Sequence, residues 1–361
     1  MWLAAWLASV GAAPAPRWSA SDLAALSDVA ASAPAEGLSR DYGAAGLADQ
    51  PGDVSDIKAD VIALALAHDY YEGSVRTRGD PSWHIKRGDL DYRAWLDDVL
   101  SRHSVRASFR ALLPDTLAYS GLKLGLARCR AAAGRCGTLA ANLDRLRALP
   151  RNLGQRYLWV NLPAFRLDLV EDGKVVASHR VIVGKPGSQT PSFQATVTGV
   201  TINPWWNVPC SIVDESIGKL IATRPAEAAR RGFVASRDAK GRLVVRQKPG
   251  PDNALGQIKL EMPNPFGVYI HDTPSRNLFA RDTRAFSHGC IRTEDPKSLA
   301  VILLGPDKEA AVDLLLATRV SRTLKLASPV PVYVLYMTAE ADAAAPNGVT
   351  TYADIYHRDP G

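Results

Sequence analysis

The sequence lacks several features that define common classes of protein. It has no cluster of lysine and arginine with interleaved aromatic residues, so its net charge of +6 does not predict a nucleic-acid partner. No apolar run is long enough to cross a bilayer. Its 4 cysteines and 7 histidines follow none of the usual zinc-binding spacings. We therefore predict no nucleic-acid partner and no metal or organic cofactor, and the oligomeric state stays open.

The chain is organised as two domains behind a signal-like segment. Residues 1–18 read MWLAAWLASVGAAPAPRW, an apolar run followed by small residues as in a secretory signal, but no lysine or arginine precedes Arg17. We interpret this segment as an incomplete export signal, and an Ala-rich terminal helix is the alternative. A chain of 361 residues is long enough for two domains with a sizeable core.

Residues 19–150 have the spacing of a helical scaffold. Residues 37–42 are predicted to form a turn and a short helix. Cys129 and Cys136 would lie about 10 Å apart along a single helix, too far for a disulfide, but Gly134 and Gly137 indicate that the helix ends between them. A disulfide is then predicted in an oxidising compartment. Residues 55–72 predict an amphipathic helix whose apolar stripe comprises Ile57, Val61, Leu64, Ala65 and His68.

After Pro150 the pattern changes to the alternation of β-strands. The Asp172-Gly173 pair predicts a hairpin turn between two alternating runs. Asp295 followed by Pro296 predicts a helix that ends near residue 304. The predicted fold class is therefore α+β. Its parts are a helical scaffold over 19–150, a β-rich domain over 151–338 with a helical lid insert over about 205–262, and a tail over 339–361 in which residues 352–356 add an edge strand.

Two short motifs of the β-rich domain carry the chemistry. Residues 286–292 read FSHGCIR, and His271, in the sequence YIHDTP, lies 19 residues before Cys290. A thiol attacks well only as the thiolate, and a neighbouring imidazole can take its proton to leave a thiolate–imidazolium pair. The motifs therefore predict nucleophilic catalysis by Cys290 with His271 as the base.

Strand alternation predicts how the two motifs face one another. Tyr269 and His271 would share the face opposite to the core, so that both could line a cleft. Gly289 permits a tight turn that exposes the sulfur, and the amides of Gly289 and Cys290 could then point at an oxyanion. No aspartate or glutamate is an obvious third member of a triad, but the backbone carbonyl of Asp272 could orient the imidazole.

Two other interpretations compete with catalysis. A free cysteine is more often buried and inert than reactive, and a lone histidine is more often a satisfied polar residue. His271, His288 and Cys290 could also ligate zinc, but no fourth ligand suggests itself.

Together these motifs resemble the active-site signature of the L,D-transpeptidases, the YkuD-type cysteine enzymes of bacterial cell walls. The similarity covers residues 149–337 and resembles the periplasmic YcbB-like subgroup in particular. The small peptidoglycan-binding module of that subgroup has no counterpart here, because residues 118–150 leave no room for it. The segments that carry the similarity are YLWVNLPAFRLDLVEDGKVVASHRVIVG from Tyr157, NPWWNVP from Asn203, PGPDNALG from Pro249 and PNPF from Pro263.

The resemblance implies a role for each residue of the site. Cys290 would be the nucleophile and His271 the base, while His288 and Gly289 would complete the catalytic group. Arg292 would bind substrate carboxylates, which the guanidinium fork matches, with a structural salt bridge as the alternative. The remaining predicted substrate-binding residues are Tyr269, which could add a hydroxyl to the oxyanion site, Ser287 and Asp272.

The activity that the resemblance implies is peptidoglycan crosslinking. Cys290 would attack the carbonyl of the third residue of a stem peptide, D-alanine would leave from the fourth position, and an amine of a second stem would take the acyl group to give a 3→3 crosslink. The same residues would serve an L,D-carboxypeptidase or an exchanger of D-amino acids, and a non-catalytic wall-binding scaffold is a third alternative. The resemblance also implies a periplasmic location, stem peptides as partners and carbapenem-type β-lactams as covalent inhibitors.

Overall fold

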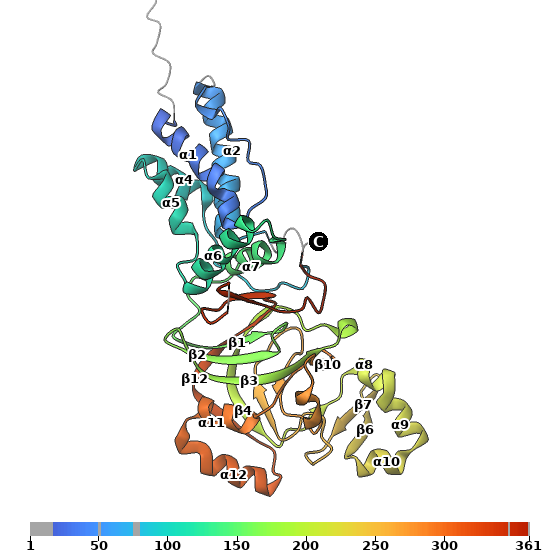
Figure 1. The fold of residues 1–361 in the computed structure, drawn as a ribbon. Helices are drawn as coiled ribbons and strands as arrows, with labels where there is room; N and C mark the ends of the chain where they lie inside the picture. The colour runs from blue at the N-terminus through green and yellow to red at the C-terminus, as the bar shows by residue number, and fades with distance from the viewer. Residues whose placement is uncertain (1–16, 50–51, 75–79, 346, 360–361) are drawn as a thin grey trace, which may run out of the picture. The chain divides into compact units, whose positions relative to one another are not determined.

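The fold is that of a computed structural model, which describes residues 17–49, 52–74, 80–345 and 347–359 (Figure 1). Most of the signal-like segment lies outside these residues. Among the helices described, none combines the length and the apolar character that a membrane span requires. The chain forms two compact units, which are Met1–Ser74 with Arg87–Ala148 and Ala341–Val349, and Val75–Lys86 with Leu149–Glu340 and Thr350–Gly361.

The first unit is helical, as predicted, and side-chain caps begin several of its helices. The hydroxyl of Ser19 accepts the Asp22 N–H at 3.1 Å, and the carboxylate of Asp91 accepts the Arg93 and Ala94 N–H groups. The helices are α1 (Ala20–Ser32), α2 (Gly52–Tyr71), α4 (Tyr92–Ser101), α5 (Val105–Leu112), α6 (Leu117–Ala131) and α7 (Gly137–Arg147), with 3₁₀ turns η1 (Ala33–Glu36) and η2 (Leu47–Asp49).

The predicted apolar stripe of α2 was wrong. Ile57 is 71% exposed and Val61 64% exposed, and the stripe's other members are only half-buried. The helix instead buries Ile62, Leu66 and Tyr70, which recur every four residues together with alanines of the same face. Because the helix carries its own apolar residues on most of its sides, their periodicity alone did not identify the face that packs against the rest of the unit.

A second prediction for the helical unit also failed, and a third was confirmed. Residues 37–42 form no helix, because Gly37 adopts φ +81° and ends the 3₁₀ turn η1. The Cys129–Cys136 disulfide is present, with a Cα–Cα distance of 5.9 Å. It joins the end of α6 to the start of α7, since the helix does break between the two cysteines.

The second unit is built on a nine-stranded sheet. Its order is β10-β3-β11-β9-β8-β4-β12-β1-β2, and because β3 also pairs with β2 the sheet closes on itself. The predicted Asp172-Gly173 hairpin is confirmed, with both residues at positive φ between β2 and β3. The strands are β1 (Arg156–Asn161), β2 (Arg166–Glu171), β3 (Lys174–Gly184), β4 (Phe193–Ile202), β8 (Ile258–Glu261), β9 (Ile270–His271), β10 (Ala285–Ser287), β11 (Ile291–Thr293) and β12 (Arg322–Leu335).

Two helices and the inward side chains of the strands make the core of this unit. The Asp295 carboxylate accepts the Ser298 N–H at 3.1 Å and caps α11 (Pro296–Leu304), as predicted from the sequence. Leu299 and Leu303 of α11 and Val312 of α12 (Glu309–Thr318) are buried among residues of the sheet. This core fixes the strands that carry the two motifs. Short 3₁₀ turns complete the unit at η3 (Pro186–Ser188), η5 (Arg276–Ala280) and η6 (Pro306–Lys308).

The lid insert forms a lobe of its own beside the sheet, drawn in yellow in Figure 1. It contains the predicted helices and also a three-stranded sheet of order β5-β7-β6. Trp206, Phe233 and Val245 are buried in its small core. Its elements are β5 (Trp206–Asn207), α8 (Cys210–Ile212), the π-helix η4 (Val213–Ile217), α9 (Gly218–Thr223), α10 (Pro225–Arg230), β6 (Phe233–Arg237) and β7 (Leu243–Gln247).

The tail departs from its prediction. Residues 352–356 form no edge strand; instead β13 (Ala339–Ala341) pairs with β14 (Val349–Thr351) in a two-stranded sheet. Tyr356 lies in the core of the second unit, where its ring stacks on that of Tyr336 and its hydroxyl donates to the Gly184 carbonyl at 2.6 Å. The segment was predicted as a strand because it contains apolar and aromatic residues. Tyr356 is buried without belonging to a strand.

Candidate active site

The nucleophile motif forms a tight turn between β10 and β11. Gly289 adopts φ +114°, a conformation that other residues rarely adopt. The Ser287 hydroxyl accepts the Gly289 N–H at 3.0 Å and donates to the Cys290 carbonyl at 2.6 Å, and Thr190 donates to the Gly289 carbonyl at 2.8 Å. The hydroxyl of Ser287 is therefore used to hold the turn, and the substrate contact that we predicted for it stays a prediction.

The turn leaves the Cys290 thiol partly exposed. Its sulfur lies 3.8 Å from the carbonyl oxygen of Gly267, in the loop that precedes β9. The side chain of Asn264 orders that loop through hydrogen bonds to the backbone of Met262, Phe266 and Val268, at 2.7–3.2 Å. The carbonyl beside the sulfur is thus held by a side chain of the PNPF segment.

The two backbone amides predicted to stabilise an oxyanion differ in their hydrogen-bond partners. The Gly289 N–H already donates to the Ser287 hydroxyl. The Cys290 N–H makes no hydrogen bond within the described residues. The Cys290 amide can therefore donate a hydrogen bond to an oxyanion directly, whereas the Gly289 amide would first have to break its hydrogen bond to Ser287.

His271 is buried, on the face of β9 opposite to the core residue Ile270. Its Nδ1 lies 2.5 Å from the Asp272 carbonyl oxygen, so Nδ1–H donates and Nε2 carries the lone pair. The orienting carbonyl considered in the sequence is thus present. Burial, and then the charge of Arg292, lower the pKa of His271 to about 3.

The thiol and the imidazole are not hydrogen-bonded to each other within the described residues. Burial raises the pKa of the Cys290 thiol, and this outweighs the backbone of Tyr269 and the charges of Arg292 and Lys259, which lower it. Both shifts favour a thiol and a neutral imidazole over a thiolate–imidazolium pair. Catalytic hydrogen bonds are often long in unliganded enzymes, so the missing contact does not count against the pairing.

The Asp272 carboxylate holds the neighbouring backbone through hydrogen bonds. It accepts the Thr273 N–H at 2.6 Å and the Gln257 N–H at 2.8 Å, and it pairs with Arg276 at 2.6 Å. A side chain at Gly256 would collide with it, since a Cβ there would lie 2.3 Å from the carboxylate. The substrate-binding role that we predicted for Asp272 stays a prediction, and its carboxylate has three partners already.

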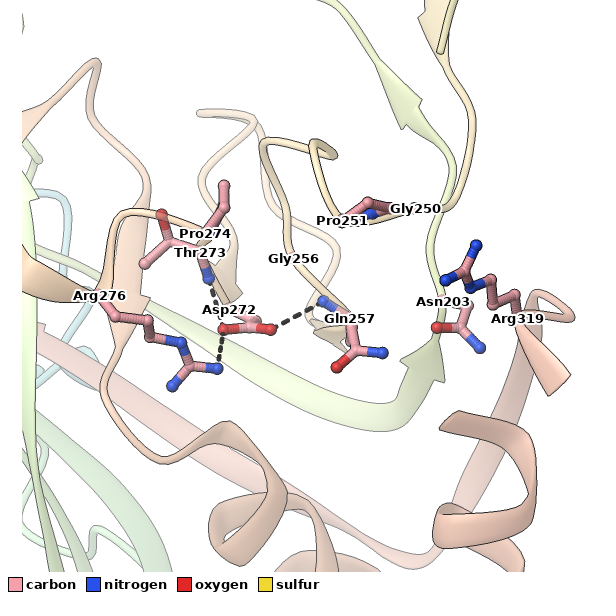
Figure 2. Close-up of a pocket in the computed structure, with 10 residues that line it drawn as sticks. All are labelled: Asn203, Gly250, Pro251, Gly256, Gln257, Asp272, Thr273, Pro274, Arg276 and Arg319. Carbon is pink, nitrogen blue, oxygen red and sulfur yellow. Dashed lines mark hydrogen bonds and ion pairs between the residues drawn. The ribbon is translucent and has the colours of Figure 1, made fainter. Parts of the chain in front are cut away.

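A cavity of about 250 Å³ lies beside Asp272 (Figure 2). Figure 2 shows Arg276 and Arg319 on opposite sides of it. Cys290 does not line this cavity. It is therefore a polar recess next to the loop that follows His271, and the Cys290 sulfur lies outside it.

His288 faces the lid. Its Nε2 lies 3.1 Å from an oxygen of Glu215 and 3.4 Å from the Lys185 ammonium, and Lys185 lies 3.7 Å from Glu215. Glu215 belongs to the π-helix of the lid. The two histidines of the motifs thus have different surroundings, because His271 is buried beside its carbonyl partner and His288 is exposed in an ion-pair cluster.

Arg292 and Tyr269 lie close to Cys290. Arg292 is opposite His271 in the pairing of β11 with β9. Its Nε is buried without a partner within the described residues, and burial lowers the pKa of the guanidinium. The structural salt bridge that was the alternative for Arg292 is not found there. Tyr269 is half-buried, and burial and the neighbouring Cys290 raise the pKa of its hydroxyl.

Residues 80–86, predicted from the sequence to belong to the helical scaffold, pack in the second unit instead. The His84 N–H donates to the Ser192 carbonyl at 2.7 Å, and Asp80 pairs with Arg358 at 3.5 Å, both side chains being buried. The His84 ring lies 4.6 Å from the ring of Phe266, the residue before the carbonyl that faces the sulfur. A segment far from both motifs in the sequence thus packs against the loop that precedes β9.

Three residues near the site were not identified from the sequence. Lys259 alternates with the buried residues of β8, and this alternation could have placed it on the same face as His271. Glu215 and His84 gave no local signal, because each comes near the site only through long-range packing.

Comparison with known proteins gives two family matches. The profile of the L,D-transpeptidase catalytic domain, YkuD, matches residues 155–331, and that of the scaffold domain matches residues 12–126. A curated protein of Haemophilus influenzae named "Putative L,D-transpeptidase" is 32% identical over 241 residues, which are 61% of this chain and 48% of that protein. The chain thus spans about half the length of that curated relative.

Solved structures of L,D-transpeptidases also match in part. One from Mycobacterium smegmatis is 17% identical, covers 50% of this chain and 58% of its own, and has a TM-score of 0.26. The catalytic domain from Enterococcus faecium, acylated by ertapenem, is 16% identical, covers 51% of this chain and 99% of its own, and has a TM-score of 0.24. These TM-scores are too low to compare the sites residue by residue, and the YcbB-like subgroup stays a prediction.

The predicted α+β fold and the predicted family are therefore both confirmed. Residues 155–331, which follow a helical scaffold domain in the sequence, form an L,D-transpeptidase catalytic domain of the YkuD family, whose members are cysteine-dependent enzymes.

Proposed function

We propose that this chain is a peptidoglycan L,D-transpeptidase that forms 3→3 crosslinks through a thioester on Cys290. The observation that carries the proposal is the partly exposed thiol on a turn between two strands of a YkuD domain, with a buried, carbonyl-oriented imidazole on the neighbouring strand. This combination supplies a nucleophile and a base, which acyl transfer from an amide requires.

The reaction has two halves. In the first, the sulfur attacks the carbonyl carbon of the third stem residue while Nε2 of His271 takes the thiol proton. The Cys290 N–H would stabilise the oxyanion. As the tetrahedral intermediate collapses, the amide C–N bond breaks and the imidazolium returns the proton to the amine of the leaving D-alanine. A thioester on Cys290 remains.

In the second half, an amine of another stem attacks the thioester. His271 takes a proton from this amine, the C–S bond breaks, and the thiolate is reprotonated. Water as the acceptor would give L,D-carboxypeptidase activity, and a free D-amino acid would give exchange. The residues are the same in all three cases, so the acceptor decides the outcome.

Two further parts of the proposal concern inhibitors and location. The Enterococcus faecium catalytic domain is acylated by ertapenem, and another L,D-transpeptidase has been solved in complex with imipenem, so we propose that carbapenems acylate Cys290 here. The Cys129–Cys136 disulfide supports an oxidising compartment, and we propose the periplasm.

The experiment that tests the function is product analysis. The protein is incubated with a disaccharide tetrapeptide, and products are separated and weighed by mass spectrometry. We expect a dimer whose mass is that of two substrates less one alanine, and none with Cys290→Ser. A tripeptide monomer as sole product would assign the carboxypeptidase activity instead. No conversion at all, with a folded protein, would favour the non-catalytic scaffold.

A further inference from the structure

Two basic side chains stand on either side of the catalytic base. In the sheet, Lys259 of β8 pairs directly with His271 of β9, which pairs in turn with Arg292 of β11. Residues opposite one another in paired strands point to the same face. The face that carries His271 is therefore flanked by one lysine and one arginine.

The Lys259 ammonium lies in a half-buried position beside the nucleophile. Its side chain is 19% exposed, and its Nζ lies 3.1 Å from the Glu261 carboxylate and 4.7 Å from the ring centre of Tyr269. Its neighbours along the strand, Ile258 and Leu260, are buried in the core on the other face. Lys259 thus shares the Tyr269 side of the sheet, where the sulfur also lies.

The positive charge at this place is only partly balanced. Glu261 also accepts the hydroxyl of Thr201, at 2.5 Å, so its carboxylate is shared. Arg292 has no carboxylate partner within the described residues, and its Nε is buried and unpaired. Of these two cations only Lys259 has a carboxylate partner, and Thr201 shares that carboxylate. An ammonium has three N–H donors, and Lys259 gives one of them to Glu261, so donors remain for an anion.

We propose that Lys259 and Arg292 form a carboxylate-binding site astride His271, in which Lys259 is the residue that selects an anionic substrate. The ligand class is a peptide with a carboxylate close to the scissile carbonyl, and this deepens the proposed function, on which it rests for the identity of the substrate. Both side chains are half-buried: Lys259 keeps 19% of its surface exposed, and Arg292 lies next to the thiol with its Nε buried.

The first test needs no turnover, so it can fail or succeed independently of the crosslinking activity. Cys290 is alkylated with iodoacetate, which carries a carboxylate, and with neutral iodoacetamide. In both reactions the S–C bond forms, iodide leaves, and the thiol proton passes to His271 or water. Exposed Cys210 is removed by Cys210→Ser, and rates are measured by intact-protein mass spectrometry.

The comparison is between Lys259→Met and Lys325→Met. Lys325 is an exposed lysine of β12 with no ion pair within the described residues, so it is a matched control. A unit charge about 5 Å from a carboxylate in a water-like medium changes a rate roughly fourfold. We expect Lys259→Met to lower the ratio of iodoacetate to iodoacetamide rates about three- to tenfold, Lys259→Arg to restore it, and Lys325→Met to leave it unchanged.

Two results would overturn the proposal. If Lys259→Met slowed both reagents equally, the lysine would act on the thiol and not on the ligand. If the ratio did not move in a protein whose circular dichroism is unchanged, Lys259 would be a structural partner of Glu261 and nothing more.

A second test identifies which carboxylate is bound. Steady-state KM is compared for tetrapeptide donors amidated either at the terminal D-alanine or at another stem carboxylate. The amidation that raises KM in the wild type, and has no further effect in Lys259→Met, marks the carboxylate that the site receives. If neither amidation changes KM, no carboxylate is recognised there and the proposal fails.

Discussion

The resting state of the catalytic pair can be tested directly by changing the pH. The pKa of His271 is lowered from an ordinary 6.5 to about 3, by burial first and by Arg292 second. A shift of this size corresponds to about 5 kcal/mol against charging the imidazole, and to roughly one protonated molecule in 10³–10⁴ at a pH of about 6.5. Burial also raises the pKa of Cys290. Both shifts disfavour the thiolate–imidazolium pair that the sequence suggests.

The assay follows the ultraviolet absorbance of the thiolate, which the thiol lacks. Difference spectra are recorded between the Cys210→Ser protein and the Cys210→Ser/Cys290→Ser protein, so that only Cys290 contributes. We expect no thiolate signal across the range of about pH 4–8, because neither group ionises there. The proton would then move to His271 only during attack, when the new imidazolium gains the developing negative charge as its partner.

The rate of carbapenem acylation across the same range supplies the second readout. A neutral pair predicts no inflection near the ordinary histidine pKa of about 6.5. The reasoning would be refuted by a thiolate signal at neutral pH that disappears in His271→Ala, since that result means a preformed ion pair. An inflection of the acylation rate near the ordinary histidine value would likewise indicate a preformed ion pair.

The other predictions concern single residues. Cys290→Ser should abolish acylation by a carbapenem while Cys210→Ser keeps most of it, and intact-protein mass spectrometry showing the reverse would move the nucleophile. His271→Ala should slow single-turnover acylation by about 10²–10⁴-fold, and His288→Ala should slow it less because the His288 ring faces the lid. If His288→Ala were inactive and His271→Ala retained activity, His288 and not His271 would be the base. His84→Ala loses a ring contact worth about 0.5–1.5 kcal/mol and should slow acylation through the loop before β9, so an unchanged rate with a lowered Tm would limit it to stability. The lowered pKa of His271 gives stability that is present above about pH 6.5 and lost as the pH falls towards about 3, so His271→Gln should flatten the unfolding free energy over that range, and parallel curves in urea titrations would contradict the assigned pKa.

The sequence predicted most where the signal is local. The Asp172-Gly173 turn, the helix that begins after Asp295 and the break between Cys129 and Cys136 each depend on a few neighbouring residues. The two motifs that predict the family are local in the same way. Their residue types and spacing predict a cysteine nucleophile and a histidine base before any long-range contact is known.

The sequence predicted least where packing decides. The face of α2 could not be chosen because apolar residues surround the helix, and Ile57 proved to be 71% exposed. The contact of His288 with Glu215 and the ring contact of His84 join residues that are distant along the chain. Lys259 was predictable only in part. The sequence shows that it alternates with apolar residues, but its pairing with His271 depends on the register of β8 and β9.

The central claim is that Cys290 carries the acyl group during turnover. The most direct measurement is intact-protein mass spectrometry of the Cys210→Ser protein mixed with a tetrapeptide donor and quenched in acid within one turnover. We predict a mass increase equal to the donor less one D-alanine, located by peptide mapping on Cys290. Release of D-alanine without this adduct, or an adduct of that mass on any other residue, would contradict the account.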